Sequence, residues 1–137
     1  AGSLSLLSPK PKHPIIVSNC DIMTDINYED LLNFHNNHKA DATMAVRIHE
    51  WENPYGVVQT KGVEIINFEE KPIVRSHINA GVYVLQPSTI DLIKKSEKLD
   101  MPTLFQRIKK KNLKTIVYPV HEPWLDIGRP EDYYKAK

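Results

Sequence analysis

The sequence contains little of what several protein classes require. Cys20 is the only cysteine among 137 residues, so an internal disulfide is excluded, and one chain cannot build a zinc site from cysteines alone. A reducing cytoplasm fits this composition best. No apolar run approaches the roughly 20 residues that cross a bilayer, and no basic region followed by an apolar stretch opens the chain. We therefore expect a soluble cytoplasmic protein without a membrane partner.

A strong net charge is also missing. Eighteen basic residues nearly balance seventeen acidic ones, so no overall field favours nucleic acid or an anionic membrane. The densest basic run, Lys109-Lys110-Lys111, is better explained by the end of a helix, where cations interact favourably with the helix dipole. The apolar fraction of 41% is enough to build the core of one domain. We expect a single domain over residues 1–137.

The first half of the chain has the pattern of a strand, a helix and a second strand. Residues 15–17 form a β-branched run that ends at Ser18-Asn19-Cys20-Asp21, as a buried strand of a parallel sheet would. Asn27 can cap a helix with one apolar face, made by Tyr28, Leu31, Leu32 and His35. Residues 42–48 then read as a strand, and this order predicts parallel pairing of the two strands through a right-handed crossover.

The second half adds antiparallel and helical elements. Residues 56–60 and 63–68 flank a Lys61-Gly62 turn and predict a β-hairpin. Residues 79–85 predict another strand, followed by a short helix that includes Ile90 and Ile93. Pro102 starts a longer helix with Leu104, Phe105 and Ile108 inward, and residues 115–120 form the last strand. The fold class is α/β, with a mixed, mainly parallel sheet flanked by helices and an antiparallel hairpin insertion.

One motif near the C-terminus, Trp124-Leu125-Asp126-Ile127-Gly128, places a lone carboxylate between an aromatic residue and a glycine turn. Asp126 can be a turn or capping residue ahead of a helix that Arg129-Pro130 opens. It can equally be a functional carboxylate at the end of a core strand. The motif alone leaves both interpretations open.

Four segments taken together are more specific: Ser18-Asn19-Cys20-Asp21, Glu69-Glu70-Lys71-Pro72, Asn79-Ala80-Gly81 and the Trp124 motif. Their order resembles the sugar-phosphate nucleotidyltransferases, enzymes that join a nucleoside triphosphate to a sugar 1-phosphate and release pyrophosphate. The resemblance runs from about Leu4 to the end, and includes Tyr55-Gly56-Val57-Val58 and Pro130-Glu131-Asp132-Tyr133. It implies a Rossmann-like fold. Within the family, it is strongest to bacterial enzymes that supply activated sugars for surface polysaccharides, including guanylyltransferases.

The resemblance identifies Asp21 and Asp126 as carboxylates that hold Mg²⁺. A hard divalent ion prefers oxygen ligands, typically one or two carboxylates with substrate phosphates and water completing the shell. Both residues follow predicted strands, and open α/β sheets bind ligands at such strand ends. The alternative is a pair of unrelated turn aspartates.

The resemblance also implies a sugar pocket. Lys71 matches the lysine that approaches the sugar phosphate, and Glu70 matches the acid that accepts hydrogen bonds from sugar hydroxyls. An exposed Glu-Lys pair without function is the alternative. Gly56, Gly81 and Asn79 match the pocket lining, with turn or bulge glycines as the rival interpretation. Gly2 matches a segment that lies near the nucleotide base.

The chain departs from the family pattern in two ways. The family's glycine-rich loop, with its arginine and a later Pro-Lys pair, has no match, and Pro9-Lys10-Pro11-Lys12 lies in the wrong place to replace it. The chain therefore resembles the C-terminal part of a catalytic domain, with an open sheet edge that favours self-association and with little expected turnover by itself. Cys20 stands where the family commonly has glycine.

Two other functions stay open at this point. The chain can be a non-catalytic regulatory module that binds a sugar phosphate or a nucleotide, or a structural interaction domain without a ligand. Ligand binding separates them, because a real ligand must raise the melting temperature.

Overall fold

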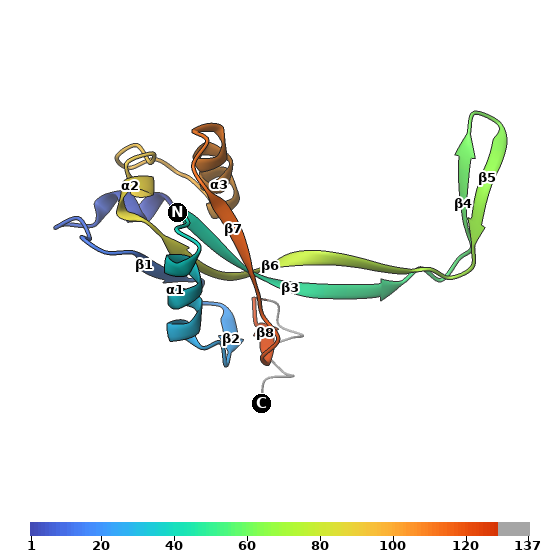
Figure 1. Cartoon of the computed structure of the whole chain (residues 1–137), viewed down its shortest axis with the longest axis horizontal. Helices are drawn as coiled ribbons and strands as arrows, with labels where there is room; N and C mark the ends of the chain where they lie inside the picture. The colour runs from blue at the N-terminus through green and yellow to red at the C-terminus, as the bar shows by residue number, and fades with distance from the viewer. Residues whose placement is uncertain (129–137) are drawn as a thin grey trace.

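The computed structural model describes residues 1–128, which form a mixed α/β body and a long arm (Figure 1). The body contains a four-stranded sheet in the order β1-β6-β3-β7. These strands are β1 (Ile15–Ser18), β3 (Ala42–Glu52), β6 (Ile73–Leu85) and β7 (Thr115–Pro119). β3 and β7 pair in parallel, whereas β6 runs antiparallel to β1 and to β3. Three of the four strands share one direction, and the expected mixed α/β class is confirmed.

The pairing of the first strand differs from the expectation. β1 and β3 run in the same direction, but β6 lies between them, so β1 pairs with β6 and the predicted direct parallel pair does not form. Along β1, half-buried and exposed residues alternate, as on a sheet edge rather than in a buried strand. The local pattern predicted the strand and its direction. It could not predict the neighbour, because β6 comes from a distant part of the chain.

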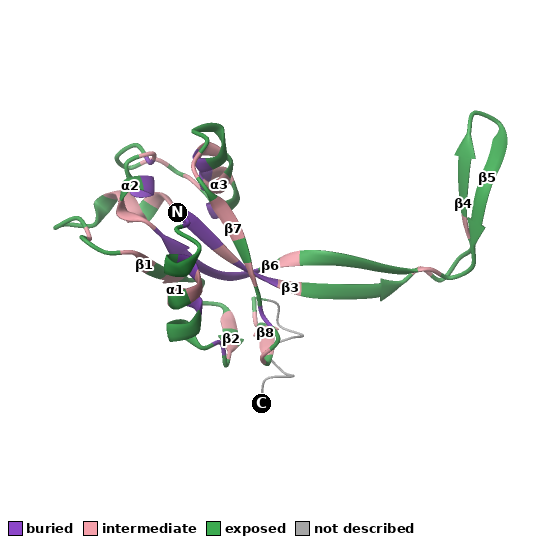
Figure 2. Cartoon of the chain, in the orientation of Figure 1, coloured by how far each residue is buried: buried purple, intermediate pink, exposed green. Residues whose placement is uncertain are grey.

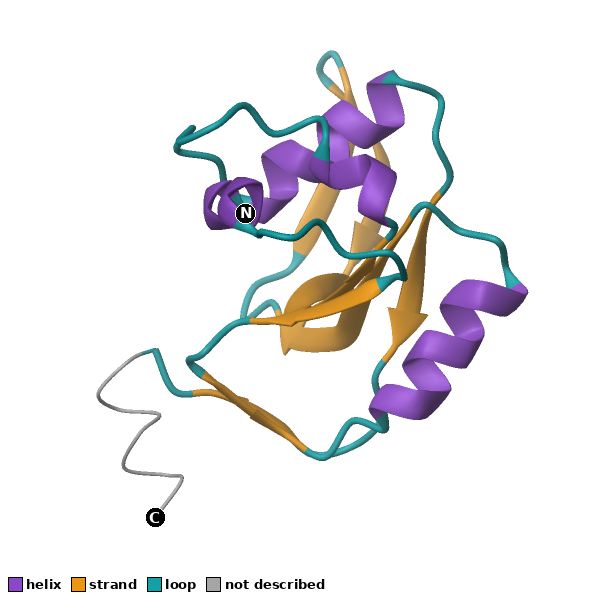
Figure 3. Ribbon diagram, turned by 90° about the vertical axis from the view of Figure 1, so that its left-hand side faces the viewer, coloured by secondary structure: helices purple, strands orange, loops and turns teal. Residues whose placement is uncertain are grey.

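Helices cover both faces of the sheet (Figure 3). α1 (Tyr28–Asn37) packs on one face, where Leu31 contacts a cluster that includes Val82 and Val84 of β6. α2 (Pro87–Ile90), α3 (Met101–Lys110) and the 3-10 helix η1 (Gly2–Leu6) lie on the other face, near Tyr83 and Leu85. Residues 80–85 of β6 are therefore buried on both sides, as the purple segment in Figure 2 shows.

The helix ends follow the sequence signals. Asn27 caps α1, its side-chain oxygen accepting from the backbone N–H groups of Glu29 at 3.0 Å and Asp30 at 3.3 Å. Tyr28, expected on the buried face, is instead 42% exposed. α3 begins at Met101, one residue before the predicted start, and Ile93 is buried although it lies beyond the end of α2.

A buried polar contact joins α1 to the sheet. The His35 side chain is fully buried, and its Nδ1 lies 2.8 Å from the hydroxyl of Thr43 on β3. The Nε2 of Gln86 lies 3.2 Å from the Nε2 of His35 and can only donate there. The ring proton therefore belongs on Nδ1, which donates to Thr43. Burial lowers the pKa of His35 below its ordinary value of 6.5, although the charge of Asp41 acts in the opposite direction.

The arm, residues 48–77, is a two-stranded ribbon that ends in a hairpin (Figure 1). The outer parts of β3 and β6 form the ribbon, and β4 (Val57–Lys61) and β5 (Glu64–Glu69) form the hairpin. The hairpin was predicted and is confirmed. The ribbon was not predicted, because the expected strands covered only residues 42–48 and 79–85. In the structure, β3 runs on to Glu52 and β6 begins at Ile73. At about 3.3 Å per residue, it carries the hairpin roughly 20 Å from the body.

Gly81 lies in an irregular part of β6 between the body and the arm. The regular register between β3 and β6 is interrupted after the Met44–Tyr83 pair and resumes at the Val46–Asn79 pair. Gly81 has a φ of +76°, and its carbonyl accepts from the Asn19 N–H at 2.8 Å. A Cβ on Gly81 would lie 3.1 Å from the Asn19 Nδ2. Such bulges bend a strand and redirect its side chains.

A separate antiparallel pair completes the described structure: β2 (Ile22–Thr24) and β8 (Trp124–Asp126). The predicted helix start at Arg129-Pro130 and the Pro130-to-Tyr133 match lie outside the described residues. Within residues 1–128, no helix is long and apolar enough to cross a membrane.

Gly81 and Gly62 provide a matched test of the close contact with Asn19. Both have positive φ, but a Cβ on Gly62 would meet nothing within 4 Å. Gly62→Ala should cost about 1 kcal/mol of unfolding free energy from backbone strain. Gly81→Ala should cost about 1 to 3 kcal/mol more, because Asn19 must also move. Urea unfolding measures both, and equal losses would show that the Asn19 contact adds no constraint.

His35 should make the stability of the fold depend on pH. Because its folded pKa is lowered, the unfolded chain binds a proton first as the pH falls through 6.5. The free energy of unfolding should therefore have its full value above pH 6.5 and decrease as the pH falls below it. Urea unfolding between pH 8 and pH 5 should show a weaker decrease in His35→Gln than in the parent chain. His38→Gln, at an exposed position, serves as the control, and identical slopes in all three proteins would refute this origin of the pH dependence.

Candidate active site around Asp21 and Asp126

The β2–β8 pair brings two distant segments of the chain together. Asp21 directly precedes β2, and Asp126 is the last residue of β8, where it pairs with Ile22. The Ile127 N–H also donates to the Asp21 carbonyl at 2.8 Å. The two aspartates that the sequence singled out are therefore neighbours.

Both carboxylates approach the same point beside Gly128. A Cβ on Gly128 would lie 3.0 Å from the Asp126 Oδ1 and 3.2 Å from the Asp21 Oδ2. The Gly128 N–H donates to the Asp126 Oδ1 at 2.8 Å, which is the contact of a turn residue. Asp126 therefore fits both interpretations that the motif left open: it stabilises the turn, and it faces a second carboxylate across a space that glycine leaves free.

Trp124 anchors this arrangement to the body. Its indole N–H donates to the Ala80 carbonyl of β6 at 2.8 Å, and its ring packs against the core cluster that contains Leu31. The position of Asp126, two residues later, is thus linked to the central strand of the sheet. The sequence did not indicate that Trp124 connects β8 to the main sheet.

The two carboxylates suit a divalent cation whose other ligands come from outside the described chain. Mg²⁺ prefers oxygen ligands and commonly takes one or two carboxylates, with phosphates and water completing its shell. Among residues 1–128, no three or more His, Cys, Asp or Glu side chains come together around a possible metal position. The donor set of Asp21 and Asp126 therefore fits Mg²⁺ in a shared site and does not form a closed protein cage.

A cavity of about 600 Å³ adjoins Asp21. Its lining comes from η1, the end of β1, β6 and the start of α3, and it includes Asn19, Cys20, Asp21, Asn79, Tyr83 and Asp100. The charged side chains in this lining are both acidic. A second hollow, of about 470 Å³, lies along β2 and Pro123 and contains none of the predicted site residues.

Asn19, Tyr83 and Asp100 line the cavity but were not among the predicted site residues. Asn19 stands two residues before Asp21 at the end of β1, a position that the strand-end argument could have included. Tyr83 follows Asn79 by four residues in one predicted strand. Asp100 caps α3, accepting from the Thr103 N–H at 2.8 Å, and a cap gives no signal of a ligand.

Asn79 is held by hydrogen bonds at both ends of its amide. The Gly81 N–H donates to its Oδ1 at 2.9 Å, and its Nδ2 donates to the Tyr83 hydroxyl at 2.7 Å. Burial raises the pKa of Tyr83, the Asn79 hydrogen bond acts against this, and the negative charge of Asp21 raises it further. Tyr83 therefore keeps its proton at neutral pH. Asn79 and Gly81, two predicted pocket residues, lie together beside the cavity.

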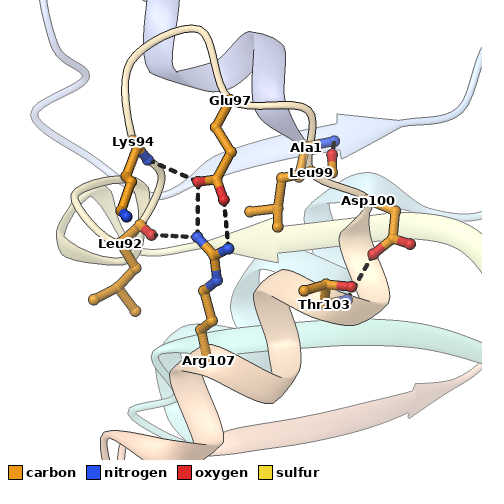
Figure 4. A network of polar contacts seen from close by, with 8 residues as sticks. All are labelled: Ala1, Leu92, Lys94, Glu97, Leu99, Asp100, Thr103 and Arg107. Atoms are coloured by element: carbon orange, nitrogen blue, oxygen red, sulfur yellow. Dashed lines mark hydrogen bonds and ion pairs between the residues drawn. The ribbon is translucent and has the colours of Figure 1, made fainter.

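An ion pair holds the segment that precedes Asp100 against α3 (Figure 4). Arg107 of α3 donates to both carboxylate oxygens of Glu97, at 2.8 and 2.5 Å, and to the Leu92 carbonyl at 3.1 Å. The hydrogen bond from Arg107 is the main cause that lowers the pKa of Glu97 to about 2. The pair fixes the segment that leads into Asp100 at the cavity wall.

Gly2 contacts this segment rather than the cavity. Its N–H donates to the Leu99 carbonyl at 2.9 Å, and a Cβ would lie 2.1 Å from the Glu97 carbonyl oxygen. Its neighbours Ala1, Ser3 and Leu4 line the cavity. The described contacts thus explain Gly2 by close backbone packing.

The remaining predicted residues lie on the arm. A Cβ on Gly56 would lie 2.8 Å from the Glu70 Oε2 and 2.8 Å from Phe68, so the base of the hairpin does bring Gly56 and Glu70 together. Lys71 follows with a φ of +45°, and all three are exposed. This end of the arm lies far from the β2–β8 pair (Figure 1). The described structure therefore separates Glu70 and Lys71 from Asp21 and Asp126.

Known proteins support the fold and the family. The chain is 36% identical over 142 residues to a mannose-1-phosphate guanyltransferase of Pichia angusta. The alignment covers 97% of this chain and 38% of that protein. A mannose-1-phosphate guanyltransferase of Yarrowia lipolytica is 33% identical over 141 residues, with the same coverage of 97% and 38%. The chain thus spans about two fifths of the length of these curated relatives.

A solved structure shares the fold. HddC from Yersinia pseudotuberculosis, solved with GMP-PN, matches with a TM-score of 0.64 and 21% identity, over 98% of this chain and 59% of that chain. The family model described as nucleotidyl transferase matches residues 3–137. The chain belongs to the nucleotidyl transferase family.

Proposed function

We propose that this chain forms part of the active site of a sugar 1-phosphate nucleotidyltransferase, which converts a nucleoside triphosphate and a sugar 1-phosphate into a nucleoside diphosphate sugar and pyrophosphate. The main support is the placement of Asp21 and Asp126 around Gly128, next to a cavity that contains Asn79. Because the chain spans 38% of its relatives, the activity of the whole protein is part of the proposal.

The names of the relatives favour particular substrates. Two relatives are mannose-1-phosphate guanyltransferases, so we favour mannose 1-phosphate and GTP. The sequence resemblance supports a role in supplying activated sugars for bacterial surface polysaccharides, and the single cysteine favours a cytoplasmic location. The end strands β1 and β7 each have one partner within the described sheet, which favours self-association.

In this proposal, the protein mainly positions the substrates and neutralises charge. Bound Mg²⁺ would supply positive charge next to the phosphates, and Asp21 and Asp126 would hold it. A phosphate oxygen of the sugar 1-phosphate attacks the α-phosphorus of the triphosphate, and the bond to the departing pyrophosphate breaks in line. Such a reaction requires no nucleophile from the protein.

Lys71 and Glu70 take part only if the arm comes closer to the body. Lys71 would then offer its charge to the sugar phosphate, and Glu70 would accept hydrogen bonds from sugar hydroxyls. The ribbon that carries them has two strands and no third strand beside it in the described structure. Two-stranded ribbons are marginally stable in water, so bending of the arm costs little.

A binding module is the second candidate function. The charged side chains that line the cavity are Asp21 and Asp100, whereas a triphosphate requires nearby cations. The chain by itself is thus better suited to bind a sugar phosphate than to turn over a triphosphate. We expect the isolated chain to show little activity.

The aspartate pair can be tested with Mn²⁺ as a probe of the magnesium site. Asp21→Asn and Asp126→Asn should each weaken Mn²⁺ binding by more than about tenfold, the scale seen when even residues around metal ligands are lost. Asparagine can keep the Gly128 hydrogen bond, so circular dichroism and melting should change little. Electron paramagnetic resonance titration measures free Mn²⁺.

Asp25→Asn is the control, because Asp25 is exposed just after β2 and away from Gly128. Its Mn²⁺ affinity should equal that of the parent chain. Unchanged binding in both Asp21→Asn and Asp126→Asn would rule out the proposed site.

The activity itself is tested by pyrophosphate release from the full-length protein. We expect the highest rate with GTP and mannose 1-phosphate among the common triphosphates and hexose 1-phosphates, and no release without Mg²⁺. A folded, Mg²⁺-loaded protein that releases no pyrophosphate with any pair would contradict catalysis and leave the binding module.

A further inference from the structure

Tyr83 lies in the core, and its hydroxyl contacts Asn79, a candidate substrate-binding residue. The residue is 2% exposed, and its ring packs 5.9 Å from the ring of Phe105 of α3, between centroids. Its hydroxyl reaches the cavity lining and accepts from the Asn79 Nδ2 at 2.7 Å. A tyrosine used for packing alone could be a phenylalanine, so the hydroxyl calls for a separate explanation.

The contact determines which way the Asn79 amide faces. The Gly81 N–H can only donate, so it fixes the amide oxygen on its own side, and the amide nitrogen must then face Tyr83. One N–H of Asn79 is used by Tyr83, and the second stays available on an exposed side chain. The hydroxyl of Tyr83 accepts from Asn79 and keeps its own proton for another acceptor.

We propose that Tyr83 is a positioning residue, which locks the Asn79 amide so that its second N–H faces an acceptor oxygen of the bound sugar 1-phosphate. The proposal rests on the proposed function for the identity of the ligand. The rigid support comes from the bulge at Gly81, because its N–H binds the other end of the same amide. Both hydrogen bonds are partly buried, and because they hold opposite ends of one amide, they restrict its rotation.

The test compares Tyr83→Phe with Tyr118→Phe in this chain. Tyr83→Phe keeps the ring in the core and removes only the hydroxyl. Tyr118, on β7, packs its ring 5.2 Å from Phe34 and does not line the cavity, so it provides a matched control. Binding of mannose 1-phosphate with Mg²⁺ is measured by calorimetry. We expect about fivefold to tenfold weaker binding in Tyr83→Phe, the effect of one lost hydrogen bond, and no change in Tyr118→Phe.

A second variant and a second measurement separate the possible failures. If Tyr83 acts through Asn79, then adding Tyr83→Phe to Asn79→Ala should weaken binding little further. The side-chain amide resonances of Asn79 report its orientation without any ligand, and they should shift and exchange faster in Tyr83→Phe but not in Tyr118→Phe. Unchanged resonances in Tyr83→Phe, or unchanged sugar-phosphate affinity in a chain that binds, would overturn the positioning role. Absence of binding in the parent chain, with shifted Asn79 resonances, would instead refute the proposed ligand and retain the lock.

Discussion

The candidate site depends on the pairing of β2 with β8. This short antiparallel contact, extended by the hydrogen bond from Ile127 to the Asp21 carbonyl, places the two carboxylates beside Gly128. It is joined to the central sheet by the indole of Trp124, which donates to Ala80 of β6. β6 in turn bends at Gly81, where Asn19 packs and where Asn79 is held. The aspartate pair and the cavity lining are therefore connected through β6.

The sequence predicted the local elements well, because their signals are local. The Asn27 cap, the hairpin around Gly62 and the helix start near Pro102 each follow from side chains within a few residues. The position of β6 between β1 and β3 did not follow, since strand pairing joins segments that local periodicity treats separately. The length of the arm was also missed, because its outer strands mix apolar, charged and small residues without a regular alternation.

The structure brings some of the predicted site residues together and separates others. Asp21 with Asp126, Asn79 with Gly81, and Gly56 with Glu70 are each brought together, but the last pair lies on the arm with Lys71. A family resemblance predicts which residues contribute to one site, but it does not predict how far a two-stranded ribbon carries them from the body. That distance depends on how the ribbon bends and on what it contacts. The arm exposes large apolar residues, including Val63, Ile65 and Phe68, so a packed arm would bury more apolar surface than an extended one. Tyr83 was missed because an aromatic residue in a predicted core strand is expected for packing alone, and Asp100 was missed because it caps α3.

The most direct measurement is the paramagnetic broadening of backbone amide resonances by Mn²⁺ at substoichiometric concentration. Broadening should begin at Asp21, Asp126 and Gly128, then reach Asn19 at the cavity, and leave the arm unaffected. Broadening that begins at the acidic residues of the arm, Glu50 and Glu52, or that has no centre on the chain, would contradict a metal site formed by the β2–β8 pair.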